Sequence, residues 1–163
     1  MTGSGARAER DAAVPIVLDE ISKAIIEQLQ DDGRRPYAQI ARAVGLSEAA
    51  VRQRVQRLID TGVMQIVAVT DPLTLGFRRQ AMIGLRVEGD LNSVADQLVA
   101  TPEVDYVVIS AGSFDLLVEV VCEDDDHLLA LLNDKIRSIA GVRATETFVY
   151  LRLRKQTYTW GTR

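Results

Sequence analysis

The chain has little of the residues that enzymes and metal proteins commonly use. Its 163 residues include one cysteine, Cys122, and one histidine, His127. A single cysteine excludes an intramolecular disulfide and a cysteine-ligated metal cluster, and its apolar surroundings predict a buried thiol. The sequence also lacks a nucleophile elbow, a phosphate-binding loop and a dinucleotide-binding loop. We therefore expect a protein that is not an enzyme and that holds no metal or cofactor.

One acidic run could suggest a cation site. Residues 123–126 are Glu-Asp-Asp-Asp and precede His127. A calcium loop spreads its oxygen ligands over about 12 residues and bends at a glycine, and this run does neither. Acids in the first turn of a helix complement its dipole, so the run predicts a helix start.

Long apolar runs are also missing. No stretch of 18 apolar residues occurs, so a membrane-spanning helix is not expected. Residues 1–15 are polar and small and lack the apolar core of a signal peptide. We expect a disordered arm at 1–15 and a cytoplasmic protein without membrane contact.

Charge is divided unevenly along the chain. The formal net charge is -4, yet residues 34–57 contain six arginines and one acid. Residues 81–147 contain thirteen acids and four basic residues. This asymmetry predicts two modules with different partners, of which only the first suits a polyanion.

Residues 37–58 have the pattern of two short helices around a tight turn. Gly45 can adopt the positive φ that ends a helix, and Ser47 can cap the next one. Val51, Val55 and Leu58 form one apolar stripe of that second helix. A third helix at 18–30 completes a helix-turn-helix domain over 16–62, with helices at 37–44 and 47–61. The alternative to DNA binding is a solvated helical hairpin with ordinary surface charge.

The polar face of the second helix suits DNA. Arginine and glutamine make bidentate hydrogen bonds to guanine and adenine edges in the major groove, while hydroxyls, arginines and helix N-termini suit phosphate oxygens. The candidate DNA-binding residues of this helix are Ser47, Arg52, Gln53, Gln56 and Arg57.

After this domain the sequence rhythm changes. Residues 63–78 form a predicted hinge, with a strand at 63–69 that Asp71-Pro72 interrupts. Strands are expected at 81–87, 104–111, 115–122 and 142–153, and helices at 91–100 and 126–139. The order βαββαβ predicts an α+β, ferredoxin-like domain over 79–153, followed by a tail at 154–163.

In a ferredoxin-like domain two helices cover one face of the sheet. The other face is open, and Val107, Ile109, Phe148 and Tyr150 are candidates for it. An exposed apolar sheet face predicts dimerisation.

Together these motifs resemble the Lrp/AsnC, or feast/famine, family of transcription regulators. The similarity covers about residues 18–153 and rests on two sets of segments. The first set contains LDEISKAIIEQLQDDGR, IARAVGLSEAAVRQRVQRLIDTGV and DPLTLGF, and the second contains SAGSFDLLVEV and IAGVRATET. The sequence departs from the family at Ser22, where aspartate is common, and at Phe114, where tyrosine is common.

The resemblance implies a (winged) helix-turn-helix regulator of double-stranded DNA. In this regulator the helix at 47–61 reads DNA through Arg52, Gln53, Gln56 and Arg57, and phosphates are bound by Arg34, Arg35 and Arg42. It implies dimers through the ferredoxin-like domain, tetramers or octamers built from them, and an amino-acid effector between dimers. The implied effector-binding residues are Gly112, Ser113, Phe114, Asp115, Thr145 and Thr147. A β-hairpin with Gly112 at positive φ and Asp115 bonded to local backbone would explain the same turn without a ligand.

Two other functions fit the same sequence. One is an architectural DNA-binding protein that needs no ligand, and the other is an amino-acid sensor that does not bind DNA. The tail contains the only tryptophan, Trp160, for which we expect a contact between subunits.

Overall fold

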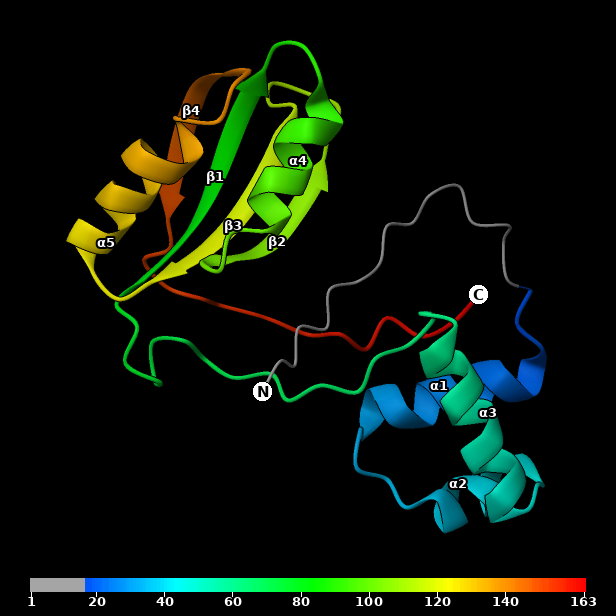
Figure 1. Ribbon diagram of the computed structural model, residues 1–163. Helices are drawn as coiled ribbons and strands as arrows, with labels where there is room; N and C mark the ends of the chain where they lie inside the picture. Colours follow the sequence, from blue (N-terminus) through cyan, green and yellow to red (C-terminus); the bar gives the residue numbers. More distant parts are fainter. Residues whose placement is uncertain (1–16) are drawn as a thin grey trace. The chain divides into compact units, whose positions relative to one another are not determined.

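A computed structural model describes residues 17–163, which form two compact units. The helical domain comprises the chain up to Ala68 together with Lys155–Arg163, and the sheet domain comprises Val69–Arg154 (Figure 1). The predicted arm at 1–15 lies outside the described residues. Within 17–163, no helix is long and apolar enough to cross a membrane.

The helical domain contains three helices, α1 (Glu20–Asp31), α2 (Tyr37–Val44) and α3 (Glu48–Asp60). All three were predicted from the sequence at nearly these bounds. Their core is small and apolar, and Ile25, Ile40 and Val51 are completely buried in it. Burial of one stripe from each helix explains why three short helices are stable together, because isolated helices of this length are marginal in water.

The predicted hinge is only partly as expected. The strand predicted at 63–69 is absent, and Ile66, Val67 and Val69 are exposed. A strand needs a neighbour to satisfy its backbone groups, and none of the segments between 17 and 163 pairs with this one. The predicted break is confirmed by a turn in which Asp71 accepts the Leu73 N–H at 3.1 Å.

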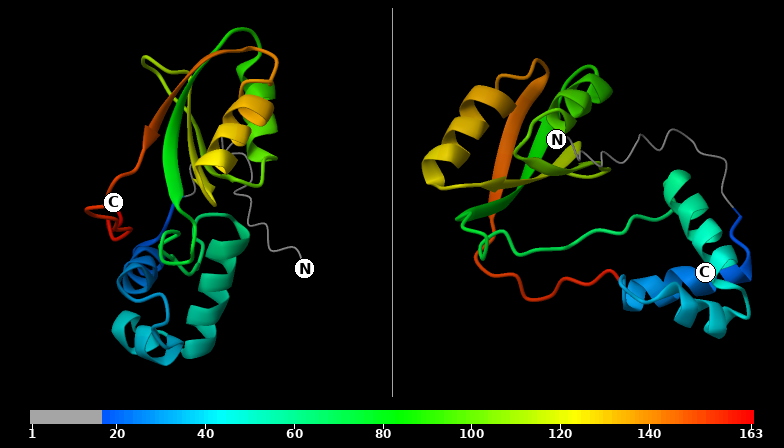
Figure 2. Two further views of the ribbon diagram at one scale, coloured as in Figure 1. Left: turned by 90° about the vertical axis from the view of Figure 1, so that its left-hand side faces the viewer. Right: turned by 60° about the horizontal axis from the view of Figure 1, so that its bottom comes forward.

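The sheet domain has the predicted βαββαβ order. Its elements are β1 (Arg79–Val87), α4 (Leu91–Val99), β2 (Val104–Ile109), β3 (Leu116–Cys122), α5 (Asp125–Ala130) and β4 (Val142–Val149). A π-helical segment, Leu131–Ile136, continues α5. The strands lie in the order β2-β3-β1-β4 with antiparallel neighbours, and the two helices cover one face (Figure 2).

Strand β3 shows how the sheet is held. Its alternate residues Leu116, Val118, Val120 and Cys122 are fully buried against the helices. The buried thiol was predicted, and burial raises the pKa of Cys122 to about 11. Asp124 caps α5 by accepting the His127 N–H at 2.9 Å, so the acidic run does begin a helix.

The open face of the sheet differs from the prediction in β2. Val107 pairs with the buried Val118 and packs against the helix-covered core. Ile109 pairs with the buried Leu116 and therefore points to the same side. The sequence did not reveal which residues of β2 face the helices, because the register shifts after Val104 and both sides of β2 carry apolar residues. The open face instead carries Tyr106, together with the correctly predicted Phe148 and Tyr150.

Candidate nucleic-acid interface and effector turn

The turn between α2 and α3 is built as the sequence predicts. Gly45 has φ 71° and donates its N–H to the carbonyl of Ala41. Ser47 accepts the Ala50 N–H at 3.2 Å and begins α3. The cap leaves the Ser47 hydroxyl proton and the first N–H groups of α3 at the surface, where an anion such as a phosphate could bind.

Four of the predicted DNA contacts are side chains without a partner. Gln53 and Arg57 are exposed on α3, and Arg34 and Arg42 are exposed nearby. Between residues 17 and 163, none of these four side chains makes a hydrogen bond or ion pair. They can therefore bind DNA without first breaking an internal contact.

Two other predicted residues of α3 have partners on the surface. Arg52 pairs with Glu48 at 3.0 Å, and its guanidinium lies 5.3 Å from the ring centre of Tyr37. Gln56 donates to Asp60 at 2.8 Å. Exposed contacts of this kind are weak, so DNA can replace them. The stacking on Tyr37 orients Arg52, a role for Tyr37 that the sequence did not reveal.

Arg35 has a structural role. Its guanidinium binds Asp31 and Gln28 on α1, and the side chain is largely buried. These bonds hold the loop before α2 against α1. The predicted phosphate contact by Arg35 stays a prediction, and it would compete with these bonds.

Arg54 connects α3 to α1. Its Nη1 donates to Asp19 Oδ2 at 2.7 Å and to Ser22 Oγ at 3.1 Å, and Asp19 also caps α1 by accepting the Ser22 N–H at 2.8 Å. Hydrogen bonds from Ser22 and then Arg54 lower the pKa of Asp19 to about 2. We call these three residues the α1–α3 clasp. The clasp gives a role to Ser22, which stands where aspartate is common in the family. Its hydroxyl accepts a hydrogen bond from Arg54.

The turn between β2 and β3 is held by hydrogen bonds to β1 and by bonds within the turn. The Asp115 N–H donates to Leu85 O at 2.9 Å, and Asp115 Oδ2 accepts the Val87 N–H at 2.8 Å. The Ser110 hydroxyl donates to Phe114 O at 2.7 Å. The Asp115 carboxylate thus bonds the backbone of β1, 28 residues away in the chain, and not the local backbone that the ligand-free interpretation predicted. Gly112 does not have the positive φ predicted for it, because these other bonds shape the turn.

Phe114 lies over Gly84 on the open face of the sheet. A Cβ atom at Gly84 would be 2.6 Å from the Phe114 ring. The ring also packs edge-on against Phe148, with centroids 6.2 Å apart. Gly84 was missed in the sequence, where a glycine inside a predicted strand was the only signal of a close approach.

Thr145 and Thr147 do not join Phe114 in one pocket of this chain. They pair with the buried residues Leu85 and Ile83 on β1, so they face the helix-covered side. Arg137, which follows the π-helical segment, donates to Thr145 Oγ1 at 3.0 Å. The resemblance implied that Thr145 and Thr147 face the same pocket as the turn at 112–115, but alternation along β4 puts both threonines on the opposite face from Phe114.

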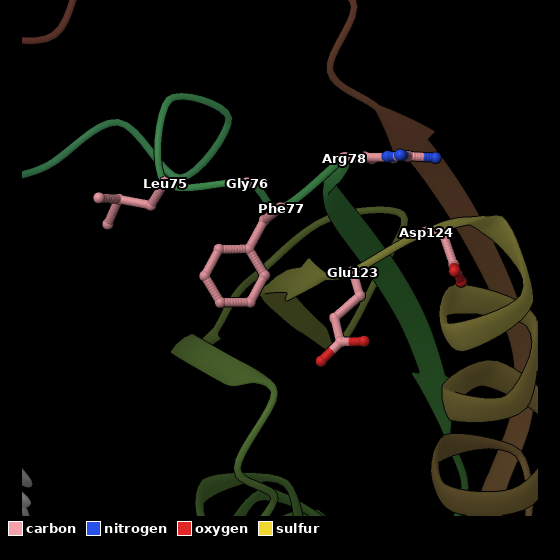
Figure 3. A pocket seen from close by; sticks show the side chains of 6 residues that line it. All are labelled: Leu75, Gly76, Phe77, Arg78, Glu123 and Asp124. Atoms are coloured by element: carbon pink, nitrogen blue, oxygen red, sulfur yellow. The ribbon is translucent and has the colours of Figure 1, made fainter.

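Two hollows lie at the far end of β3 from this turn. One, of about 420 Å³, is lined by residues 75–78 and by Glu123 and Asp124 (Figure 3). The other, of about 320 Å³, includes Glu103, Asp105 and His127 in its lining. Neither is lined by residues 112–115, so neither is the predicted effector turn. Among residues 17–163, no three histidine, cysteine or acidic side chains are grouped to hold a metal ion.

These features define a helix-turn-helix protein with an attached α+β domain. An AsnC-type helix-turn-helix profile matches residues 18–59, and a profile described as a C-terminal dimeric alpha+beta barrel domain matches residues 77–163. The regulator FL11 of Pyrococcus furiosus is 36% identical over 143 residues, covering 86% of this chain and 94% of that protein. The chain belongs to the Lrp/AsnC family and is a transcriptional regulator with a DNA-binding helix-turn-helix domain.

Solved structures of similar proteins agree with this fold. The leucine response regulatory protein LrpA of Mycobacterium tuberculosis has a TM-score of 0.78 and 28% identity, covering 85% of this chain and 96% of that one. Escherichia coli AsnC has a TM-score of 0.73 and 25% identity, covering 87% and 97%. A Neisseria meningitidis regulator in complex with L-Met, at 24% identity, 88% and 96% coverage and a TM-score of 0.74, shares the fold.

Proposed function

We propose that a dimer of this protein presents two α3 helices to a roughly two-fold DNA operator. The observation that carries the proposal is the set of partner-free side chains Gln53, Arg57, Arg34 and Arg42 around the capped start of α3. Gln53 and Arg57 read base edges, and Arg34 and Arg42 bind phosphates. Half-sites about one helical turn apart are expected for such a dimer.

The test compares two matched double variants in a shift assay on the protein's own promoter. Gln53→Ala with Arg57→Ala should abolish discrimination between operator and random DNA, because a good bidentate base contact contributes about 1–3 kcal/mol. Gln97→Ala with Arg143→Ala removes the same two residue types from the sheet domain and should change nothing. Unchanged discrimination in the first variant would refute the assignment of α3. Broad protection of any sequence in footprinting would favour an architectural protein.

We propose that the dimer forms through the open face of the sheet. Tyr106 and Phe148 are half exposed there, and the matching family profile is described as dimeric. Phe148→Glu should shift the protein to monomers in sedimentation, while Leu129→Glu on the exposed side of α5 should not. Tetramers or octamers would be built from these dimers. A variant Phe148→Glu that remains dimeric would move the interface elsewhere.

We propose that an amino acid or a related small molecule binds between dimers and contacts the turn at 112–115. Gly112 supports this, since a Cβ there would meet nothing within 4 Å and its backbone is open to a ligand. LrpA, a similar protein, is named for a leucine response, and the same fold occurs in a complex with L-Met. The second oxygen of Asp115 is the acceptor we assign to an ammonium group.

Calorimetry with each of the twenty amino acids tests this effector site. Gly112→Val should remove the heat of binding, because it fills the open space without positive-φ strain. Ala111→Val, one residue earlier and also exposed, should keep it. If no amino acid releases or absorbs heat with the unaltered protein, the effector proposal fails while the DNA-binding proposal stands.

A further inference from the structure

The C-terminal segment belongs to the helical domain although the whole sheet domain precedes it. Residues 155–163 group with the three helices and not with the sheet. Two chain connections therefore cross between the domains, one after Ala68 and one after Arg154. If the helical domain were attached to the sheet domain by one linker alone, only the connection after Ala68 would be present.

The last residues bind one face of α1. The Gly161 N–H donates to Gln30 Oε1 at 3.0 Å. The Thr162 hydroxyl and N–H both donate to Glu27 Oε1, at 2.6 and 3.3 Å. Glu27 and Gln30 are one turn apart, so their side chains lie together on α1. The opposite side of α1 faces the core through Ile25 and Leu29.

The contact is confined to Gly161 and Thr162 and depends on the backbone conformation of Gly161. Gly161 has φ 73°, a conformation that other residues rarely adopt. Residues 151–160 are exposed, whereas Gly161 and Thr162 are half-buried. Trp160 is 76% exposed and packs only edge-on against Tyr158. The expected contact of Trp160 with another subunit stays a prediction. Within this chain, the attachment depends on the polar bonds of the two residues that follow Trp160.

We propose that Glu27 and Gln30 form a docking site for the C-terminal segment of the same chain. When the segment is docked, the DNA-binding domain is held at both connections and its range of orientations is narrow. Because the bonds are few and the interface has no apolar anchor, docking is reversible. Release of the segment leaves the hinge at 63–78 as the only restraint. This regulatory consequence rests on the proposed dimer with two reading helices, whereas docking itself does not.

Trp160 makes docking measurable in the full-length protein, because it is the only tryptophan. Time-resolved fluorescence anisotropy should show slow motion of Trp160 in the unaltered protein. Glu27→Ala with Gln30→Ala should give a several-fold larger fast component, and Gly161→Val should do the same through backbone strain. The matched control, Glu20→Ala with Gln39→Ala, removes the same residue types from the surface of α1 and α2 and should leave the decay unchanged. Equal decays in all four proteins would overturn the proposal.

Mixed dimers decide whether the segment docks on its own chain. Chains with Glu27→Ala and Gln30→Ala keep Trp160 but lack the site, and chains ending at Lys155 keep the site but lack tryptophan. If docking is within one chain, mixing them leaves Trp160 fast. Restoration of slow motion in the mixture would show docking on a second copy and overturn the assignment.

Operators with altered half-site spacing test the consequence. The unaltered protein should prefer one spacing strongly, and the variant without the docking site should lose part of that preference with little loss of affinity at the best spacing. Failure of both proteins to bind any operator would refute the proposed function and leave the anisotropy result intact. An unchanged spacing preference in a variant with released Trp160 would refute the restraint on orientation.

Discussion

The helical domain has a much smaller apolar core than the sheet domain, and both domains also have ion pairs between their elements. The buried apolar cluster has six residues in the first and thirteen in the second. A core of six residues buries little surface, so the clasp of Asp19, Ser22 and Arg54 and the bonds of Arg35 have a larger share in its stability. The arginines of residues 34–57 are therefore of two kinds. Some bond other parts of the helical domain, and the others have no partner among residues 17–163 and are available to DNA.

The sheet domain has ion pairs of its own, such as Arg79 with Asp125 and Lys135 with Glu103. Its apolar cluster of thirteen residues gives these ion pairs a smaller share in its stability. The comparison teaches that net charge identifies the module that binds DNA but does not identify which arginines do so.

The largest expected effect is on the core of the sheet domain. Ile83 is completely buried in β1, and Ile83→Ala should lower the free energy of unfolding of that domain by about 2–5 kcal/mol. Ile66→Ala, at an exposed position, serves as control. Urea unfolding followed by far-ultraviolet circular dichroism should show two transitions, of which only that of the sheet domain moves. Equal shifts of both transitions would show that the domains unfold together.

The next effect separates the two kinds of arginine. Arg54→Met should lower the stability of the helical domain and weaken binding to all DNA sequences while the salt dependence stays the same. Arg42→Ala should leave stability unchanged and reduce the slope of log affinity against log salt by about one. Shift assays at several salt concentrations measure both. A reduced slope in Arg54→Met would place Arg54 on a phosphate and contradict its assignment to the clasp.

Acid should weaken the clasp through Asp19. Its pKa is lowered from 3.8 to about 2 in the folded protein, so its contribution to stability is complete above about pH 4 and is lost as the pH falls toward 2. Asp19→Asn keeps a good helix cap but removes this titration. The difference in urea midpoint between the two proteins should shrink between pH 4 and 2. A constant difference over that range would exclude Asp19 as the titrating group.

The smallest effect concerns Cys122 in the sheet domain. With its thiol buried and its pKa raised to about 11, iodoacetamide at pH 8 should label the unfolded protein and leave the folded protein almost unlabelled. Mass spectrometry measures the labelled fraction over time. Rapid labelling of the folded protein would show that β3 opens locally.

The order of elements was predictable because each has a strong local signal. Alternation in β3, the stripe Val51, Val55 and Leu58, and the pair Gly45 and Ser47 each determine one element. Contacts between distant segments have no such signal. The bonds of Arg54 to Asp19 and Ser22 span more than 30 residues, and the side of the sheet to which Val107 or Thr145 points depends on pairing with other strands.

The close approach of Gly84 and Phe114 limits how this sequence can change. A side chain at 84 and a large ring at 114 exclude one another, since the ring occupies the place of the missing Cβ. A larger residue at 84 is tolerated only after residue 114 has become small. In the reverse order, the intermediate protein has a side chain at 84 that clashes with the Phe114 ring. Among descendants of this sequence, the two positions should therefore vary together and in a fixed order.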